Sequence, residues 1–263
     1  MRLYWEIARR GYRRFAAYPA ATVAGIFTNV VFGFLIAYIL LAVFAEQGQI
    51  GSYDASDAVT YTWLAQGLLM TVYIWGWYEV ALRVQSGDVA TDLQRPLDFQ
   101  LYWLAQDLGR AAYHAAFRGI PPFMIGALAF DVRLPGDPLL WLAFPVSVAL
   151  AVVVSFAFRF LFNLGAFWLL DYRGVAIIAM VISTFFSGQL IPIALFPDWL
   201  MHLAWALPFA SMVQAPIEVF LGHARGVELA GLLALQAFWG AVLLLAGRAV
   251  FSAGTRKLVV QGG

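Results

Sequence analysis

Long apolar stretches limit what this chain can fold into more than any other feature. An α-helix needs roughly 20 apolar residues to cross the hydrocarbon of a bilayer. Because 63% of the residues are apolar and only 12% are charged, a soluble core could not bury them all. We therefore predict an all-α polytopic membrane protein with six transmembrane helices. Their approximate ranges are 21–44, 60–82, 111–130, 139–170, 175–192 and 227–251.

The same composition argues against several other classes of protein. Disorder requires low hydrophobicity and high net charge, and the continuous apolar runs do not alternate as those of a β-barrel do. A net charge of +1 leaves no basic face for nucleic acid. Because the chain has no cysteine, it can form neither a disulfide framework nor a thiolate metal site. The first stretch is too long for a signal h-region, so it is interpreted as an uncleaved anchor.

The basic residues lie almost entirely on one side of the predicted spans. With the N-terminus inside, 13 of the 16 fall in inner segments, and the outer loops carry mainly acidic residues. The positive-inside rule then places both termini of this multi-pass protein in the cytoplasm. The inner basic residues are Arg2, Arg9, Arg10, Arg13, Arg14, Arg83, Arg95, Arg110, Arg118, Arg173, Arg248, Arg256 and Lys257.

The N-terminal segment, residues 1–20, is predicted to be an amphipathic elbow helix in the membrane interface. Tyr4, Ile7, Gly11 and Phe15 recur at helical spacing, and Glu6 can pair with Arg10. Basic side chains crowd the opposite face, and Trp5 suits the headgroup level. The simpler alternative is a positive flank of the first span. The residues expected to act in this element are Trp5, Arg9, Arg10, Arg13 and Arg14.

The longest predicted cytoplasmic loop, residues 83–110, is too long for a plain turn between packed helices. Ser86 or Asp88 can cap a short helix that Pro96 stops, and Asp98 can cap a second helix ending near Gly109. Charges of both signs and apolar side chains suggest a docking site for a soluble protein. The residues expected to make the contacts are Asp88, Asp92, Leu93, Arg95, Pro96, Leu97 and Asp98.

Residues 187–221 break the fifth apolar stretch near the outer face. Gly188 and Pro192 interrupt the helix, and Pro197-Asp198 can begin a second short helix that Pro208 ends. A re-entrant hairpin followed by an interfacial helix from Ser211 fits this pattern, whereas a simple proline kink is the alternative. The expected outer gate consists of Gly188, Gln189, Pro192, Trp199 and Trp205.

Polar residues within the predicted spans are few. Arg159 lies near the middle of the fourth stretch, with Asn163 one turn later and Glu79 near the end of the second. A charge inside a membrane is a functional hypothesis by default. We favour a structural ion pair of Arg159 with a carboxylate such as Glu79 over a substrate contact.

Catalytic and nucleotide-binding motifs are missing from the sequence. The single lysine, Lys257, is followed by Leu258, so no Walker A loop exists. There is no HExxH zinc motif and no GxSxG nucleophile motif. We therefore expect no catalytic residue, no metal and no cofactor bound by this chain. An intramembrane enzyme would need more polar groups than Arg159 and His202 provide.

Two sequence motifs resemble a known family. Residues 87–98 read Gly-Asp-Val-Ala-Thr-Asp-Leu-Gln-Arg-Pro-Leu-Asp, and residues 167–171 read Phe-Trp-Leu-Leu-Asp. With the six-span layout they resemble a type-2 ABC transporter permease of the compact bacterial branch described as an uncharacterised ABC transport system. The resemblance covers nearly all of residues 1–263 as one permease domain.

The resemblance implies an interfacial elbow helix, a coupling helix after span two and an outer re-entrant hairpin. It also implies a location in the bacterial plasma (inner) membrane, and export through a dimer interface that the chain forms with itself or with a second permease. The aromatic, charge-poor lining predicts a hydrophobic or amphipathic substrate. Two separate ATPase subunits would bind ATP and Mg²⁺, so the permease itself is not an enzyme. The alternative is a membrane scaffold or channel that recruits another cytoplasmic protein through residues 83–110.

Overall fold

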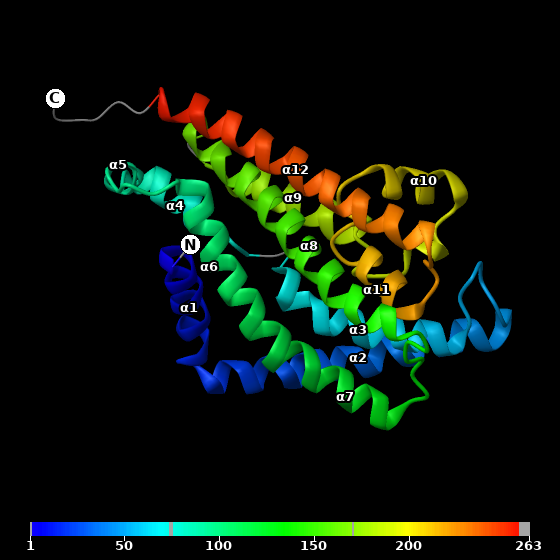
Figure 1. Cartoon of the computed structure of the whole chain (residues 1–263). Coiled ribbons are helices and arrows are strands. Elements are labelled where there is room, and N and C mark those ends of the chain that lie inside the picture. The colour runs from blue at the N-terminus through cyan, green and yellow to red at the C-terminus, as the bar shows by residue number, and fades with distance from the viewer. Residues whose placement is uncertain (1, 74–75, 170, 258–263) are drawn as a thin grey trace.

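The computed structural model describes residues 2–73, 76–169 and 171–257. Within these ranges the chain is helical throughout, and its one β feature is an isolated bridge between Ile50 and Tyr53. The predicted all-α fold is therefore confirmed for the described residues (Figure 1).

Three helices are long and apolar enough to cross a membrane. They are α2 (Pro19–Gln47), α8 (Pro138–Asn163) with its 3-10 extension Leu164–Phe167, and α12 (Val227–Thr255). At 1.5 Å per residue, the 29 residues of α2 or α12 extend about 43 Å, more than the hydrocarbon thickness. The shorter apolar helix α9 covers Arg173–Phe186. Leu170, at the end of the predicted fourth stretch, lies outside the described residues.

The second apolar stretch is not the continuous span that its hydropathy predicts. Helix α3 (Ala55–Leu68) passes into a π-helix at Leu69–Tyr73, and helix α4 begins only at Glu79–Ser86. Tyr73 and Gly76 have φ angles of 60° and 78°, which belong to the left-handed region and cannot continue an α-helix. The prediction of one helix over 60–82 was therefore wrong, and Ile74 and Trp75 within it lie outside the described residues.

The third stretch begins earlier than expected. Helix α6 (Phe99–His114) continues through a π-turn at Ala115–Gly119 into α7 (Ile120–Ala129). Pro121 and Pro122 supply no N–H groups at the start of α7, which suits a widened turn immediately before them. Gly109 therefore does not end a loop helix. The connection predicted to be cytoplasmic is therefore shorter than residues 83–110: it consists of α4, the short α5 (Val89–Leu93) and the residues between α5 and α6.

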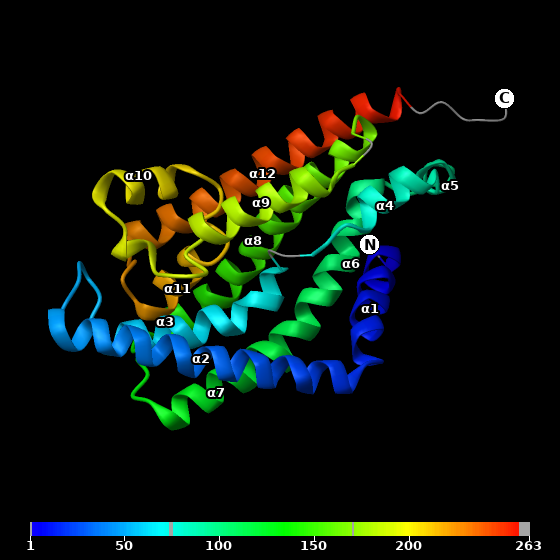
Figure 2. The same cartoon turned by 180° about the vertical axis from the view of Figure 1, so that it is seen from behind.

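Gly109 has a different role, because it lets helix α1 (Arg2–Ala16) cross α6 in close contact. A β-carbon at Gly109 would overlap the carbonyl oxygen of Ala8, and one at Gly11 would overlap that of Gln106. Figures 1 and 2 show α1 beside α6, turned sharply away from α2. The predicted apolar face of α1 is confirmed, since Ile7 and Gly11 are buried.

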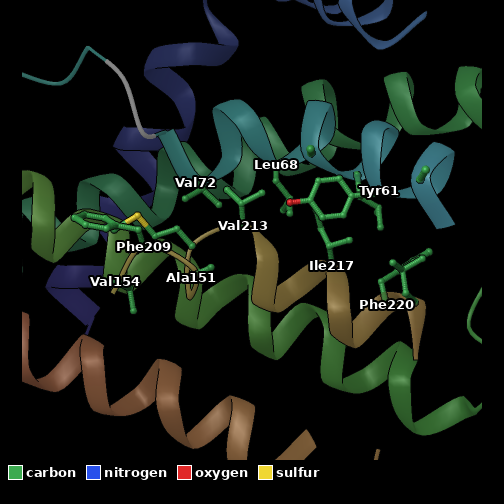
Figure 3. Close-up of a cluster of buried hydrophobic side chains, with 14 of the residues drawn as sticks. Tyr61, Leu68, Val72, Ala151, Val154, Phe209, Val213, Ile217 and Phe220 are labelled. Atoms are coloured by element: carbon green, nitrogen blue, oxygen red, sulfur yellow. The ribbon is translucent and has the colours of Figure 1, made fainter. Parts of the chain in front are cut away.

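The far end of the molecule holds the 3-10 turn Ile193–Leu195, α10 (Asp198–Ala206) and α11 (Gln214–Leu221). Helix α11 was expected to be an interfacial helix, but seven of its residues are buried. It packs against α3 and α8, where Ile217 and Phe220 meet Tyr61 and Leu68 in the main apolar cluster (Figure 3). Two helices cover α11, so it forms core instead of surface. Helix α1 and the end of α12 lie at the opposite end (Figures 1 and 2).

The glycine crossing can be tested by adding one methyl group. We expect Gly109→Ala to destabilise the protein by about 1–3 kcal/mol, because the clash is with the backbone of α1 and no side chain can move aside. Thermal unfolding of the purified protein in detergent measures the loss. Gly231→Ala in α12 is the matched control, since a β-carbon there meets no atom within 4 Å. Equal stability of the two variants would contradict the crossing.

Candidate functional site

The loop between α4 and α6, predicted to be cytoplasmic, is organised around a buried carboxylate. The Asp92 side chain is 7% exposed. Its carboxylate accepts hydrogen bonds from Nε and Nη2 of Arg83, and the bond from Nη2 is 2.9 Å long. Nη1 of Arg95 lies 3.3 Å from the same carboxylate. Asp92 therefore braces the loop and does not face a partner, which corrects the outward role expected for it.

The other predicted docking residues face outward or lie at the ends of the loop. Leu93 and Arg95 are about half exposed, Asp88 and Pro96 are exposed, and Leu97 is partly buried. A shallow recess of about 210 Å³, open to the surroundings, lies at this surface. It is lined by Asp92, Arg95, Leu97, Phe99 and Tyr102. The exposed set combines apolar and cationic side chains on a rigid base, as a protein-docking surface requires.

The far end of the loop is attached to α12. The carboxylate of Asp98 accepts a hydrogen bond from the Leu101 N–H at 2.8 Å, which confirms Asp98 as the N-cap of α6. The same carboxylate lies 3.6 Å from Nη2 of Arg248 in α12. The rings of Phe99 and Phe251 stack with centroids 4.7 Å apart. The end of the loop is therefore in contact with α12.

The near end of the loop is attached to α1. Nη1 of Arg14 lies 2.8 Å from Oε1 of Glu79, the first residue of α4. The predicted pairing of Glu6 is wrong by one residue, because its carboxylate lies 3.7 Å from Arg9 instead of bonding Arg10. Trp5 and Arg13 are exposed, as expected for the outer face of this helix.

Arg159 does not pair with Glu79. Its guanidinium is 1% exposed and forms two bonds to Asp107 of α6, at 2.7 and 3.2 Å. Arg110 donates from Nε to the same carboxylate at 2.8 Å. Two buried arginines thus share one buried aspartate. The preference for a structural ion pair is supported, whereas the expected partner was wrong.

The two arginines also join the broken second stretch to its neighbours. Arg110 donates to the carbonyl oxygens of Met70 and Thr71, the latter at 3.0 Å. Ser155 donates to that of Val72 at 2.8 Å. Backbone groups that no helical turn can satisfy are costly in an apolar interior, so these donors make the break possible.

Asn163 spans the break from the other side. Its Nδ2 donates to the Trp77 carbonyl at 2.9 Å, and its Oδ1 accepts from the Ala81 N–H at 3.0 Å. The start of α4 is thereby attached to α8.

Asp107, the shared carboxylate of the buried cluster, was not predicted from the sequence because it lay inside the segment assigned to the loop. Its spacing of three residues from Arg110, which places both on one helix face, was the available signal.

The outer end contains a second buried polar cluster that the sequence did not indicate. The hydroxyl of Tyr61 donates to the Gly188 carbonyl at 2.6 Å, and Gln189 donates to that of Ala65 at 3.1 Å. Gly188 has a φ of +83°, and a β-carbon there would overlap the Tyr61 hydroxyl. The segment after α9 is therefore packed onto α3 through residues that were predicted to form the gate.

Charged side chains of the same cluster lie at the C-terminal end of α11. His223 lies 2.9 Å from Glu218 through Nδ1 and 3.5 Å from Asp57 through Nε2. Nη1 of Arg133 lies 2.8 Å from the second oxygen of Asp57. The bonds to Asp57 and then to Glu218 raise the pKa of His223 to about 9. The imidazolium is thereby held between two carboxylates.

The remaining gate residues lie around α10. Pro192 is buried at the turn before α10, Trp199 is 69% exposed and Trp205 is partly buried. Helix α10 begins at Asp198, with Pro197 in the cap position that was expected for Asp198. His202 is exposed and bonds the Asp198 carbonyl of its own helix. Across the described ranges, no group of three or more His, Asp or Glu could hold a metal ion.

Removing the shared aspartate tests the buried cluster. We expect Asp107→Asn to cost about 3–5 kcal/mol of stability, because two arginines are left without their anion. The control is Glu79→Gln, whose partly exposed ion pair should contribute only about 0–1 kcal/mol. Thermal or denaturant unfolding in detergent compares them. A larger loss for Glu79→Gln would show that the cluster is not the main brace.

The outer imidazolium predicts a pH dependence. Because its folded pKa is raised above the ordinary value of about 6.5, the contribution of His223 is complete below that pH and disappears as the pH rises through about 9. We expect His223→Gln to melt below the wild type at neutral pH and to approach it above pH 9. His202→Gln should show no such convergence. A difference for His223→Gln that is constant across this range would contradict the assignment.

One comparison with known proteins identifies relatives of the chain. The sequence model of a family described as an ABC-2 family transporter protein matches residues 27–262. No curated protein matches the chain.

Proposed function

The chain belongs to the ABC-2 family of transporter proteins, and on that premise we propose that it is the permease subunit of an ATP-driven exporter. Membership of this family supports a permease component of an ABC transport system with an ATPase partner. Direction of transport, substrate and the second permease are our own proposals. The observation that supports coupling to an ATPase is the loop between α4 and α6, which is attached to both α1 and α12.

We place six crossings in the bacterial plasma membrane, with both termini in the cytoplasm. Helices α2, α8 and α12 supply three of them. The broken α3–α4 segment, the joined α6–α7 helix and α9 with the turn after it supply the others. Helix α1 then lies along the cytoplasmic surface, and α10 and α11 lie at the outer end. The positive-inside distribution supports this orientation.

The exposed side of the loop docks against the ATPase. Leu93 and Leu97 supply apolar contacts, and Arg95 supplies the charge. Because Asp92 holds Arg83 and Arg95 from beneath, the loop moves as one body when the ATPase closes on ATP and Mg²⁺. The Arg14–Glu79 and Asp98–Arg248 pairs carry that motion to the elbow helix and to α12.

Transport takes place at an interface between two permeases. Apolar side chains remain exposed along α2 and α9 of the single chain, including Phe27, Tyr38 and Ile178. Such faces suit lipid, a second permease and a hydrophobic or amphipathic substrate. The segment from Gly188 to Trp205 closes the path at the outer end. Its attachment to Tyr61 places it beside the second span.

The docking surface predicts a specific loss. We expect Arg95→Glu combined with Leu97→Asp to weaken binding of the ATPase subunit by tenfold or more, since two central contacts become repulsive (about 1.4 kcal/mol per tenfold). Co-purification and stimulated ATP hydrolysis in reconstituted vesicles measure binding and coupling. The fold should persist, because the Arg83–Asp92 pair remains.

The matched control is Arg256→Glu combined with Leu3→Asp. It makes the same changes on exposed side chains at the same end of the molecule. Intact assembly and coupling in the loop variant would contradict the docking surface. Capture of another cytoplasmic protein in place of an ATPase would favour the alternative function, a scaffold or channel subunit.

A further inference from the structure

Arg118 is an arginine that neither the buried cluster nor the docking loop uses. It lies in the π-turn between α6 and α7, and its guanidinium rests against α2 at Gly25. A β-carbon at Gly25 would overlap the guanidinium carbon and both neighbouring nitrogens. The missing side chain of Gly25 therefore forms the recess in which the Arg118 head group lies.

The charge of Arg118 has no counterpart within the described residues. Its Nε is buried without a hydrogen-bond partner, and among the described residues its guanidinium forms neither an ion pair nor a hydrogen bond. The buried arginines Arg110 and Arg159, by contrast, share Asp107. A charge at membrane depth is expensive unless an anion or water satisfies it. The partner of Arg118 therefore comes from outside the described part of the chain.

The position of Arg118 indicates where that partner comes from. Gly25 lies six residues after Pro19, the first residue of α2, which is about 9 Å along the helix. An arginine side chain can extend from this depth to the headgroup region. Phe117 and Ile120, one and two residues from Arg118 in the chain, are 45% and 59% exposed, so an apolar surface adjoins it. Such a surface suits lipid.

Other polar groups lie at the same junction of α2 and α6. The hydroxyls of Thr22 and Tyr113 are 2.7 Å apart, and Thr22 precedes Gly25 by one turn on α2. His114 is 3% exposed and neither ring nitrogen has a hydrogen-bond partner. The first N–H groups of α2 also have no partner within that helix. The junction thus offers hydrogen-bond donors and one cation.

We propose that Arg118 binds the phosphate of a phospholipid in the cytoplasmic leaflet, seated between the start of α2 and the π-turn. A phosphate matches the planar guanidinium with paired hydrogen bonds and carries the missing charge. The acyl chains lie along the exposed apolar side chains of α2 and α7. This proposal rests on the membrane placement above but not on the ATPase, so either can fail without the other.

A carboxylate from a second copy is the competing partner. Of the acidic side chains near the inner end, Glu79 is engaged with Arg14, Asp92 with Arg83 and Asp107 with Arg159. Asp88 and Asp171 are exposed, but they precede α5 and α9 and do not lie on α2, α6 or α7. A second copy would have to bring one of these two to Arg118. Basic pockets between helices on the cytoplasmic side bind anionic headgroups in other membrane proteins, which favours the lipid.

Native mass spectrometry can count the phospholipids that the protein retains. The full chain is taken from vesicles of equal parts phosphatidylglycerol and phosphatidylcholine, and adducts are compared for the wild type, Arg118→Gln and Gly25→Ala. We expect Arg118→Gln to lower occupancy of the tightest phospholipid adduct by about tenfold or more. We expect Gly25→Ala to lose the adduct as well, because the added methyl group displaces the Arg118 guanidinium. This variant retains the charge of Arg118 and improves the helix propensity of α2, so neither lost charge nor a weakened helix would explain the loss.

Arg173→Gln, which removes an exposed arginine at the same end of the molecule, should leave the adduct unchanged. Equal retention by Arg118→Gln and the wild type, or equal loss in Arg173→Gln, would overturn the proposal. Displacement of the lipid by inorganic phosphate would assign the site to a free anion. A change from dimer to monomer in Arg118→Gln with the adduct count unchanged would assign it to the second copy.

Discussion

The ion pair between Arg159 and Asp107 is the interaction on which the rest of the structure depends. Taken alone, either charge would be too costly to bury beneath three helices. Arg110 pairs with the same carboxylate, and the remaining donors of the two arginines reach carbonyl oxygens that the broken second stretch leaves free. The break is therefore a consequence of this cluster and not a defect in a hydrophobic helix.

The break has a functional consequence. If the second stretch ran straight, α4 would be a rigid extension of α3, and the loop would be held by the membrane helix alone. Instead, α4 is held by Asn163 of α8 and by Arg14 of α1, while the loop beyond it is attached to α12 through Asp98. The loop is thereby held by three helices. At the outer end, Tyr61 performs a similar attachment for the segment at Gly188.

Much of this organisation could be predicted from local chemistry. Asp98 caps a helix because its carboxylate reaches a free N–H three residues on, and Gly188 breaks one because its backbone takes a left-handed conformation. The partner of Arg159 could not be predicted in this way. Glu79 was the carboxylate named from the sequence, and Asp107 was missed because the start of the third helix was not known. Hydropathy placed that boundary at Ala111, because it does not count a helix that continues into polar sequence.

The sequence by itself determined that the chain is a helical membrane protein with most of its basic residues toward one end, because lipid admits long apolar helices and excludes unpaired charge. It also determined which short segments turn, since glycine and proline act locally. Only the tertiary structure decided that Asp92 is a brace, that α11 is core and that Arg118 finds no partner among the described residues. These outcomes depend on which helices meet, and contacts between segments far apart in the chain have no signature in either segment alone.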